Sequence, residues 1–398
     1  MDLTLAAEKL ALWPEGLTQE EVAALFQSPI TAASLARLAP DALAALLTQQ
    51  AGLDGLAEGM FKKIVALDCE YHKPRLQHPN IRRGPFAEFL QHRLGTARKS
   101  GLLFDHILRE VMPTSRKAFL EIGAGLGFGM LHALHRGFEQ AHGIEIDELY
   151  AQTAVEEFKG SDELHYTVGD YLKWDSDIKF DLIFCVDVLE HIQSIPACLR
   201  HLERHLSVNG LAIVRFTVAT IAGVVLNEPH YKKPWLSLCE DAGAQRALEL
   251  KIIREKSKYV VNRWPVAEDI SKWTDEYHLH AYVNIENIDT MGAPMFYTMS
   301  MWRDRLKKLN DLTSTHPIYE QLAREPQSAA WRSRVESALT ELESGGAIPF
   351  RDAMELLGSY WTLVISRKPI QAKNLVPYSW LLNGQRLRID PMGTWEAV

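Results

Sequence analysis

The residues with the clearest chemical potential form a glycine-rich stretch, Phe119 to Gly129, with the sequence Phe-Leu-Glu-Ile-Gly-Ala-Gly-Leu-Gly-Phe-Gly. A short apolar run leads into alternating glycines, and an amphipathic segment, Met130 to Phe138, comes next. This order predicts a buried strand, a tight turn and a helix. Glycine is needed where the backbone turns with a positive φ or comes close to a ligand. A lone glycine-rich turn is a weak signal, so its meaning depends on the residues further along the chain.

Acidic residues stand at the ends of the next predicted strands. These strands span residues 141–147, 164–169 and 180–186, and the acids are Glu145, Asp170 and Asp187. In open parallel sheets, ligands bind beyond the carboxyl ends of the strands, where a carboxylate can accept hydrogen bonds from a ribose diol. We therefore expect the glycine turn and these three acids to lie at one rim of an α/β sheet.

This series resembles the class I S-adenosylmethionine (SAM)-dependent methyltransferases. The glycine turn after Glu121 is similar to their first motif, and residues 180–192 are similar to their fourth. Glu145 stands where the family keeps its ribose-binding acid, and Asp170 where a side chain contacts the adenine. One departure is Leu211, which replaces a second glycine that many members have after the turn preceding the fifth strand. The resemblance covers residues 117–216, about a quarter of the chain.

The resemblance implies a Rossmann-like fold and SAM as the cofactor. The residues it places around SAM are Glu121, Gly123, Ala124, Gly125, Gly127, Glu145, Ile146, Asp170, Tyr171 and Asp187. The competing ligand is a dinucleotide, whose fingerprint is Gly-x-Gly-x-x-Gly. Here the glycines alternate, and the carboxylate of Glu121 suits the methionine ammonium of SAM better than a pyrophosphate. This pattern favours SAM.

Methyl transfer from a sulfonium is an in-line displacement that depends mainly on alignment. A general base is needed only when the acceptor starts protonated. The best candidate is His230, which follows the fifth strand in a predicted turn, with its neighbour Tyr231 and with His191 at the end of the fourth strand. His278 and His280 would share one face of an extended segment, but no third ligand is nearby, and we predict no metal site.

Three functions remain open at this point. The first is methylation of a small-molecule metabolite, which a large aromatic segment and the acidic charge favour. The second is methylation of a protein or peptide, with the N-terminal region as the recognition module. The third retains SAM but performs intramolecular displacement on its aminocarboxypropyl chain. The SAM-binding motifs would be the same for the first and third functions, so the motifs do not distinguish these two functions.

The composition of the chain limits the kinds of partner that we expect. The formal net charge of −8 argues against broad binding of nucleic acid or of an anionic membrane. The four cysteines form no Cys-x-x-Cys pair, so neither a zinc site nor a disulfide framework is indicated. The first residues lack the basic start of a signal peptide, and no apolar stretch is long enough to span a bilayer. We therefore expect a cytoplasmic protein without membrane partners.

The predicted organisation has five parts. A helical N-terminal region, residues 1–116, would serve as a cap or a homodimer contact, and it includes a basic loop at 69–83 that could hold an anionic substrate group. The Rossmann-like core comes next, at 117–256. An aromatic-rich inserted lid, 257–357, precedes the last core strand, 358–370, and an irregular tail occupies 371–398.

Overall fold

The computed structural model describes residues 100–101, 103–109, 111–230, 233–239, 261, 263–285, 296–358 and 360–398. The predicted helical region up to residue 99, its dimer contact and its basic loop lie outside these residues, as does Tyr231. The chain forms two compact units, Met1–Phe184 and Cys185–Val398. Among the described residues, no helix is both long and apolar enough to cross a membrane.

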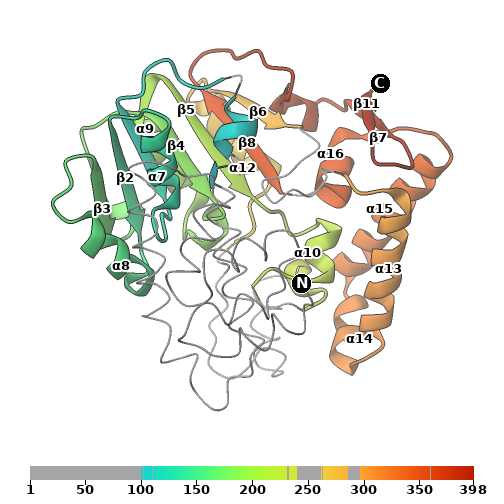
Figure 1. The fold of residues 1–398 in the computed structure, drawn as a ribbon. Coiled ribbons are helices and arrows are strands. Elements are labelled where there is room, and N and C mark those ends of the chain that lie inside the picture. The colour runs from blue at the N-terminus through green and yellow to red at the C-terminus, as the bar shows by residue number, and fades with distance from the viewer. Residues whose placement is uncertain are drawn as a thin grey trace, which may run out of the picture. The chain divides into compact units, whose positions relative to one another are not determined.

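The first unit contains a parallel sheet with helices between its strands. Its strands are β1 (Ala118–Ile122), β2 (Gln140–Glu145) and β3 (Leu164–Val168), and β2 pairs in parallel with both others. Helix α7 (Phe128–His135) follows β1 and α8 (Glu148–Phe158) follows β2, and both lie beside these strands (Figure 1). The unit also contains two short helical turns, η1 (Leu103–Ile107) and η2 (Tyr171–Lys173).

Aromatic packing fixes the base of this unit. All five side chains of β1 are buried, as expected for a strand covered on both faces. The ring of Phe104 in η1 packs in a tilted arrangement against Phe119 and Phe184, with centroid distances of 6.0 and 5.0 Å. Phe184 belongs to β4 (Phe180–Val186), a strand whose first six residues are buried. The side chain of Asp181 in the same strand accepts a hydrogen bond from the backbone N–H of Lys117, which holds the entry to β1.

The second unit begins with the elements that follow β4. These are η3 (Leu189–His191), α9 (Ile195–His205), β5 (Leu206–Phe216), α10 (Ala222–Leu226), η4 (Leu236–Leu238) and α12 (Ala267–Glu276). Strand β5 pairs antiparallel with β8 (Trp361–Ser366), and β8 pairs antiparallel with β6 (His280–Asn284). The short β9 (Leu375–Pro377) pairs with β6.

The strand order along the sheet is β3-β2-β1-β4-β5-β8-β6-β9. This order, with an antiparallel strand inserted between β5 and β6, confirms the predicted α/β Rossmann-like fold. Within the predicted last core strand, 358–370, the chain forms β8, which makes six pairs with β5, from Phe216 opposite Trp361 to Leu211 opposite Ser366.

Three details of the prediction are wrong. The predicted lid contains a sheet strand, β6, whose sequence His-Ala-Tyr-Val-Asn alternates too weakly to stand out. The tail is not irregular, since it supplies β9 and two further strands, β10 (Arg386–Ile389) and β11 (Trp395–Ala397). The predicted turn at Asn209-Gly210 lies inside β5, which continues through it ahead of the residues paired with β8. Strands this short or polar leave little periodic signal.

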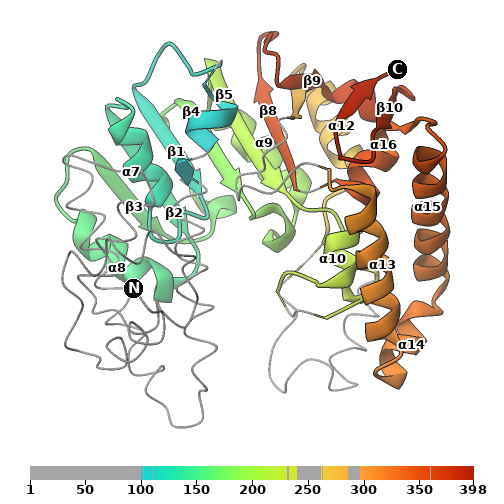
Figure 2. The ribbon, with the colours of Figure 1, turned by 45° about the vertical axis from the view of Figure 1, so that its right-hand side comes forward.

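The connection between β6 and β8 is a helical insert. It contains α13 (Met299–Thr313), α14 (Pro317–Ala323) and α15 (Pro326–Glu343). Figures 1 and 2 show α13 and α15 side by side. After them come β7 (Ile348–Pro349), α16 (Phe350–Asp352) and η5 (Ala353–Leu357), while η6 (Tyr378–Leu381) follows β9. Strands β7 and β11 flank β10 in a second, three-stranded sheet that joins insert and tail.

The half-buried His142 in β2 leads to a prediction about stability in acid. Burial, with a smaller effect of neighbouring His165, lowers the pKa of His142 from 6.5 to about 4. Between these values the unfolded chain binds a proton that the folded chain does not, so we expect stability to fall as the pH drops from about 6.5 towards 4. In the His142→Phe variant, the part of the stability loss that is due to this histidine should disappear. Chemical denaturation at a series of pH values gives the free energy of unfolding of both proteins. An equal dependence of that free energy on pH in the two proteins would contradict the prediction.

Candidate functional site

The glycine turn after β1 is held by the neighbouring strand. The backbone N–H groups of Gly123 and Ala124 both donate to the carbonyl oxygen of Ile144, at 2.8 and 3.0 Å. Gly123, Gly125 and Gly127 have φ angles of 72°, 54° and 77°, a region that side chains with a Cβ rarely adopt. A Cβ placed on Gly125 would meet no atom of the described residues within 4 Å. The turn therefore presents backbone to open space.

The carboxylate of Glu145 fastens the end of β2 to this turn. One oxygen accepts the N–H of Gly125 and the other accepts the N–H of Asp147, both at 2.9 Å. Each carboxylate oxygen retains a second lone pair that can accept a hydroxyl. The next residue, Ile146, is 70% exposed, which is unusual for a large apolar side chain. The end of β2 thus offers a fixed anionic acceptor beside an apolar surface.

Glu121 lies beneath the same turn and is nearly buried. One of its oxygens accepts the backbone N–H of Met130 at 3.2 Å. A Cβ on Gly129 would lie 2.3 Å from the other oxygen, so only glycine leaves room for this carboxylate. Its negative charge is placed in the first turn of α7, where exposed N–H groups favour an anion.

Three residues in or just after β3 complete the surroundings of the glycine turn. Asp170 caps η2 by accepting the N–H of Leu172 at 3.0 Å. The ring of Tyr171 is buried and stacks on Trp174, so its side chain belongs to the core. The hydroxyl of Tyr166 donates to the carbonyl oxygen of Gly125, a contact that the sequence did not suggest. Burial raises the pKa of Tyr166 well above its usual value, which keeps this hydroxyl protonated as a donor.

In the second unit, Asp187 forms an ion pair with a buried arginine. Asp187 has a positive φ of 57°, and its carboxylate accepts a charge-assisted hydrogen bond from Arg215 in β5. The Arg215 side chain is 2% exposed, and its guanidinium lies 3.9 Å from the ring centre of Tyr360. The sequence indicated Asp187 but gave no sign of Arg215, because a lone arginine in an apolar strand has no recognisable pattern.

The predicted catalytic histidines, His191 and His230, come together in the same unit. Their Nε2 atoms are 3.3 Å apart. The fully buried Glu228 accepts both the backbone N–H of His230, at 2.9 Å, and its ring Nδ1–H, at 2.6 Å. This pairing leaves Nε2 of His230 as the atom directed away from the carboxylate. The indole of Trp264 lies 6.2 Å from the His230 ring, measured between ring centroids.

Glu190 joins this histidine pair. It is 3% exposed, and burial, followed by the negative charge of Asp187, raises its pKa from 4.5 to about 7. Neither Glu190 nor Glu228 was predicted, although both are sequence neighbours of the predicted histidines. The other two histidines considered, His278 and His280, are placed elsewhere: His278 has a strained φ of 51°, and His280 is exposed at the start of β6.

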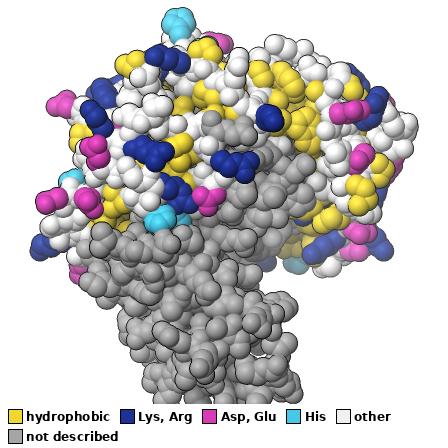
Figure 3. Space-filling view, turned by 45° about the horizontal axis from the view of Figure 1, so that its top comes forward, with side chains coloured by type: hydrophobic (Ala, Val, Ile, Leu, Met, Phe, Trp, Pro, Cys, Tyr) yellow, Lys and Arg dark blue, Asp and Glu magenta, His cyan; other side chains and the backbone are white. Residues whose placement is uncertain are grey.

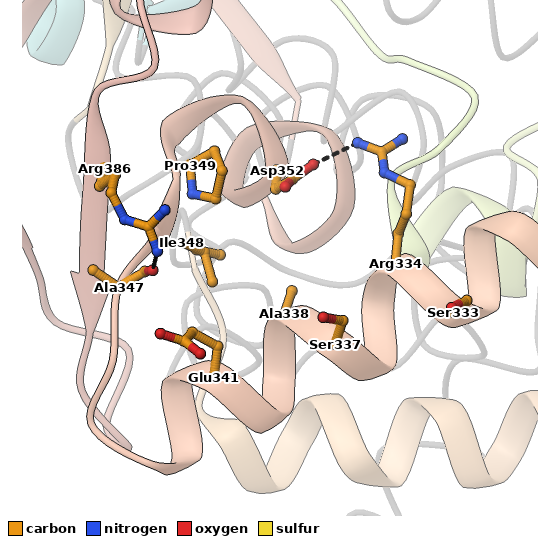
Figure 4. Close-up of a pocket in the computed structure, with 10 residues that line it drawn as sticks. All are labelled: Ser333, Arg334, Ser337, Ala338, Glu341, Ala347, Ile348, Pro349, Asp352 and Arg386. Carbon is orange, nitrogen blue, oxygen red and sulfur yellow. Dashed lines mark hydrogen bonds and ion pairs between the residues drawn. The ribbon is translucent and has the colours of Figure 1, made fainter.

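A separate cavity of about 420 Å³ lies in the insert and tail (Figure 4). It is lined by α15, the segment around β7, and β10. Both of its arginines are engaged: Arg334 pairs with Asp352 and Glu355, and Arg386 donates to the carbonyl oxygen of Ala347. The cavity holds none of the residues that sequence analysis singled out.

Comparison with known proteins shows similarity to methyltransferases. Residues 120–212 match a family model described as a methyltransferase domain. A tRNA U34 carboxymethyltransferase from Vibrio cholerae is 27% identical over 166 residues, which cover 41% of this chain and 49% of the relative. A ubiquinone biosynthesis O-methyltransferase from Rickettsia conorii is 27% identical over 121 residues, 29% of this chain and 41% of that one. The chain thus spans about half the length of the curated relatives it matches.

Among solved structures, phosphoethanolamine N-methyltransferase 2 of Haemonchus contortus in complex with SAM matches with a TM-score of 0.36 and 14% identity, over 67% of this chain and 52% of that one. The family match and the strand order together support a class I SAM-dependent methyltransferase domain at residues 120–212. SAM is the cosubstrate of such a domain.

The contact between Gly129 and Glu121 gives a direct prediction. Alanine normally stabilises a helix by about 1 kcal/mol relative to glycine. Here we expect Gly129→Ala to lower the melting temperature, because its Cβ would collide with the Glu121 carboxylate. In the double variant Glu121→Ala/Gly129→Ala the collision is gone, so its melting temperature should match or exceed that of Glu121→Ala. Thermal unfolding of the four proteins measures this, and a double variant less stable than Glu121→Ala would contradict it.

Proposed function

We propose that this protein is a SAM-dependent methyltransferase that acts on a small-molecule metabolite. The observation that carries the SAM assignment is the double hydrogen bond of Glu145, which fixes a carboxylate beside an open, glycine-lined turn. A ribose diol needs two acceptors at a fixed position, and a carboxylate with free lone pairs supplies them. Because a Cβ on Gly125 would meet no described residue, a ligand can approach the backbone there.

The chemistry of the donor set fits SAM rather than a dinucleotide. The nearly buried carboxylate of Glu121 would repel a pyrophosphate and attract the methionine ammonium. In this proposal Glu145 binds the ribose, Ile146 supplies apolar contact for the adenine, and Asp170 accepts from the adenine amino group. The backbone of Gly123 to Gly127 contacts the ligand. Asp187, which the resemblance also assigned to SAM, is proposed to orient this end of β4 through its ion pair with Arg215.

His191 and His230 are proposed to act on the methyl acceptor. Bound SAM supplies a methyl group on a positively charged sulfur, which an aligned nucleophile can displace without further activation. Glu228 fixes the ring of His230, so that its Nε2 is presented at a defined position. A neutral Nε2 can accept a proton or a hydrogen bond from a hydroxyl acceptor. Tyr231, the third predicted catalytic residue, lies outside the described residues.

Two observations favour a small-molecule acceptor. The net charge is −8, and the described surface in Figure 3 carries acidic as well as basic side chains. The helical insert also packs on the segment that carries His230: Trp331 of α15 donates to the carbonyl oxygen of Thr220 at 2.6 Å, and Trp235 donates to Thr313 of α13 at 2.7 Å. An insert anchored in this way can enclose a small acceptor.

The first test is calorimetric titration of the full chain with SAM and with S-adenosylhomocysteine. We expect wild-type binding, and at least a tenfold loss in Glu145→Ala, because its carboxylate holds the turn and accepts the ribose. Glu148→Ala removes an exposed carboxylate three residues away and serves as the matched control with unchanged affinity. Absence of wild-type binding, or an equal loss in the control, would overturn the site assignment.

The second test separates the acceptor classes. The chain is incubated with methyl-labelled SAM and with, in turn, a small-metabolite extract, bulk tRNA and a peptide mixture, and the label is located by mass spectrometry. Label in the metabolite fraction supports the proposal. Label in tRNA, the substrate named for the Vibrio relative, or in peptide would replace it, as would conversion of SAM alone to methylthioadenosine.

A further inference from the structure

The histidine cluster in the second unit has the composition and spacing of a metal site. One ligand atom each from Glu190, His191 and His230 lie within 4.8 Å of one another. Two imidazole nitrogens and one carboxylate oxygen form a donor set that suits first-row transition metal ions. From this arrangement we propose that Glu190, His191 and His230 bind one divalent transition metal ion, of the Zn²⁺, Mn²⁺ or Fe²⁺ class. This departs from the sequence-based expectation of no metal.

The spacing of the two histidines is the first argument. Nitrogen atoms bound at about 2.1 Å to one ion lie roughly 3.0 Å apart at a right angle and about 3.4 Å apart at a tetrahedral angle. The observed separation of 3.3 Å between the two Nε2 atoms falls between these values. Two neutral imidazoles can share one hydrogen bond at this distance, but only a common cation uses the lone pairs of both.

The second argument is the carboxylate that orients His230. A metal-bound histidine usually donates its other ring N–H to a carboxylate or carbonyl, which fixes its tautomer and increases its basicity. Glu228 plays this part here: it is fully buried, and it accepts Nδ1–H of His230 at 2.6 Å. Because Nδ1 carries the proton, the lone pair of Nε2 is directed toward His191.

The third argument is the buried carboxylate of Glu190. Its Oε2 atom has no hydrogen-bond partner among the described residues, although the side chain is 3% exposed. A buried polar atom without a partner is costly, and a cation would satisfy it. The ligand atoms lie within 4.8 Å of one another. With bonds of about 2.1 Å, atoms on opposite sides of an octahedral ion lie about 4.2 Å apart, so an octahedral site needs a contraction of roughly half an ångström, and a tetrahedral site needs one of about 1.4 Å.

Three protein ligands leave coordination positions for an outside molecule, as in catalytic rather than structural sites. His191 is exposed, so the site is reachable from solvent. If the proposed methyltransferase function holds, an oxygen of the acceptor occupies an open position and has its pKa lowered. With the ion bound, the lone pairs of both histidines are used by the metal, so the histidines act through it rather than as proton acceptors. The acceptor's proton passes to solvent, the oxygen forms a bond to the methyl carbon, and the electron pair of the broken carbon–sulfur bond returns to sulfur. The acceptor class is therefore a hydroxyl or a phenol.

Metal binding is tested without SAM or acceptor. The untagged full chain is treated with EDTA, desalted and titrated with Zn²⁺ by calorimetry, and with Co²⁺ by visible absorption. We expect one site with micromolar or tighter affinity for Zn²⁺ and Co²⁺ bands typical of nitrogen coordination. His191→Gln, His230→Gln and Glu190→Gln should each weaken binding by at least tenfold. Glu228→Gln, which changes only the orienting carboxylate, should weaken it by about 10- to 100-fold.

His280→Gln is the matched control, because His280 is an exposed histidine of the same unit outside the cluster. Its affinity should equal that of the wild type, and circular dichroism checks that every variant is folded. No wild-type binding, or equal affinity in wild type and the folded His191→Gln and His230→Gln variants, overturns the proposal. SAM titration of the metal-free chain is scored separately, so loss of SAM binding with intact metal binding rejects only the proposed function.

Discussion

The parallel pairing of β1 with β2 is the constraint on which the SAM-binding half depends. The register places Ile122 opposite Ile144, so the chain leaves β1 where the last carbonyl groups of β2 are still available. Two successive N–H groups donate to one of those carbonyls, and this sharp turn demands glycine. A shift of the register by one residue would turn Glu145 to the other face of the sheet. The turn and its carboxylate acceptor are therefore consequences of one strand pairing.

In the second unit, a buried arginine is paired with an acidic side chain. Arg215 is buried, and an unpaired charge there would be strongly destabilising. Asp187 provides the counter-charge, and the ring of Tyr360 covers the guanidinium. Two further carboxyl groups, Glu190 and Glu228, are buried near the histidines. So much buried acid in one small region is expensive for the fold, and its retention is explained most simply by a function that uses it.

Much of the fold follows from the sequence, for identifiable physical reasons. Strands covered on both faces, such as residues 180–186, form continuous apolar runs, and long helices such as α15 have clear periodicity. The strand β6 was missed because only Val283 in it is a strong apolar signal. Pairing with β8 on one side and β9 on the other, rather than intrinsic propensity, makes it a strand.

Some residues of the candidate site could be predicted from the sequence and others could not. Glycines and acids at strand ends have a fixed spacing, so Glu121 and Glu145 could be selected from sequence. Whether they bind SAM stays a prediction. Arg215 and Tyr166 could not be selected, because their contacts join residues 28 and 41 positions apart. Glu228 lies two positions from His230, but its burial, which makes the contact important, is visible only in the structure. His191 and His230, 39 positions apart, were chosen separately, but their proximity needed the structure.

The antiparallel placement of β6 beside β8 has a consequence for how this chain can change. The helical insert leaves the sheet after Asn284 and re-enters at Trp361, and Val283 pairs with Leu363. Its two ends are therefore clamped one strand spacing apart, about 4.8 Å, whatever lies between them. Doubling the length of such a loop costs only about 0.6 kcal/mol in closure entropy. The insert can thus change in length or sequence during evolution while the sheet that holds its two ends keeps its strand pairing.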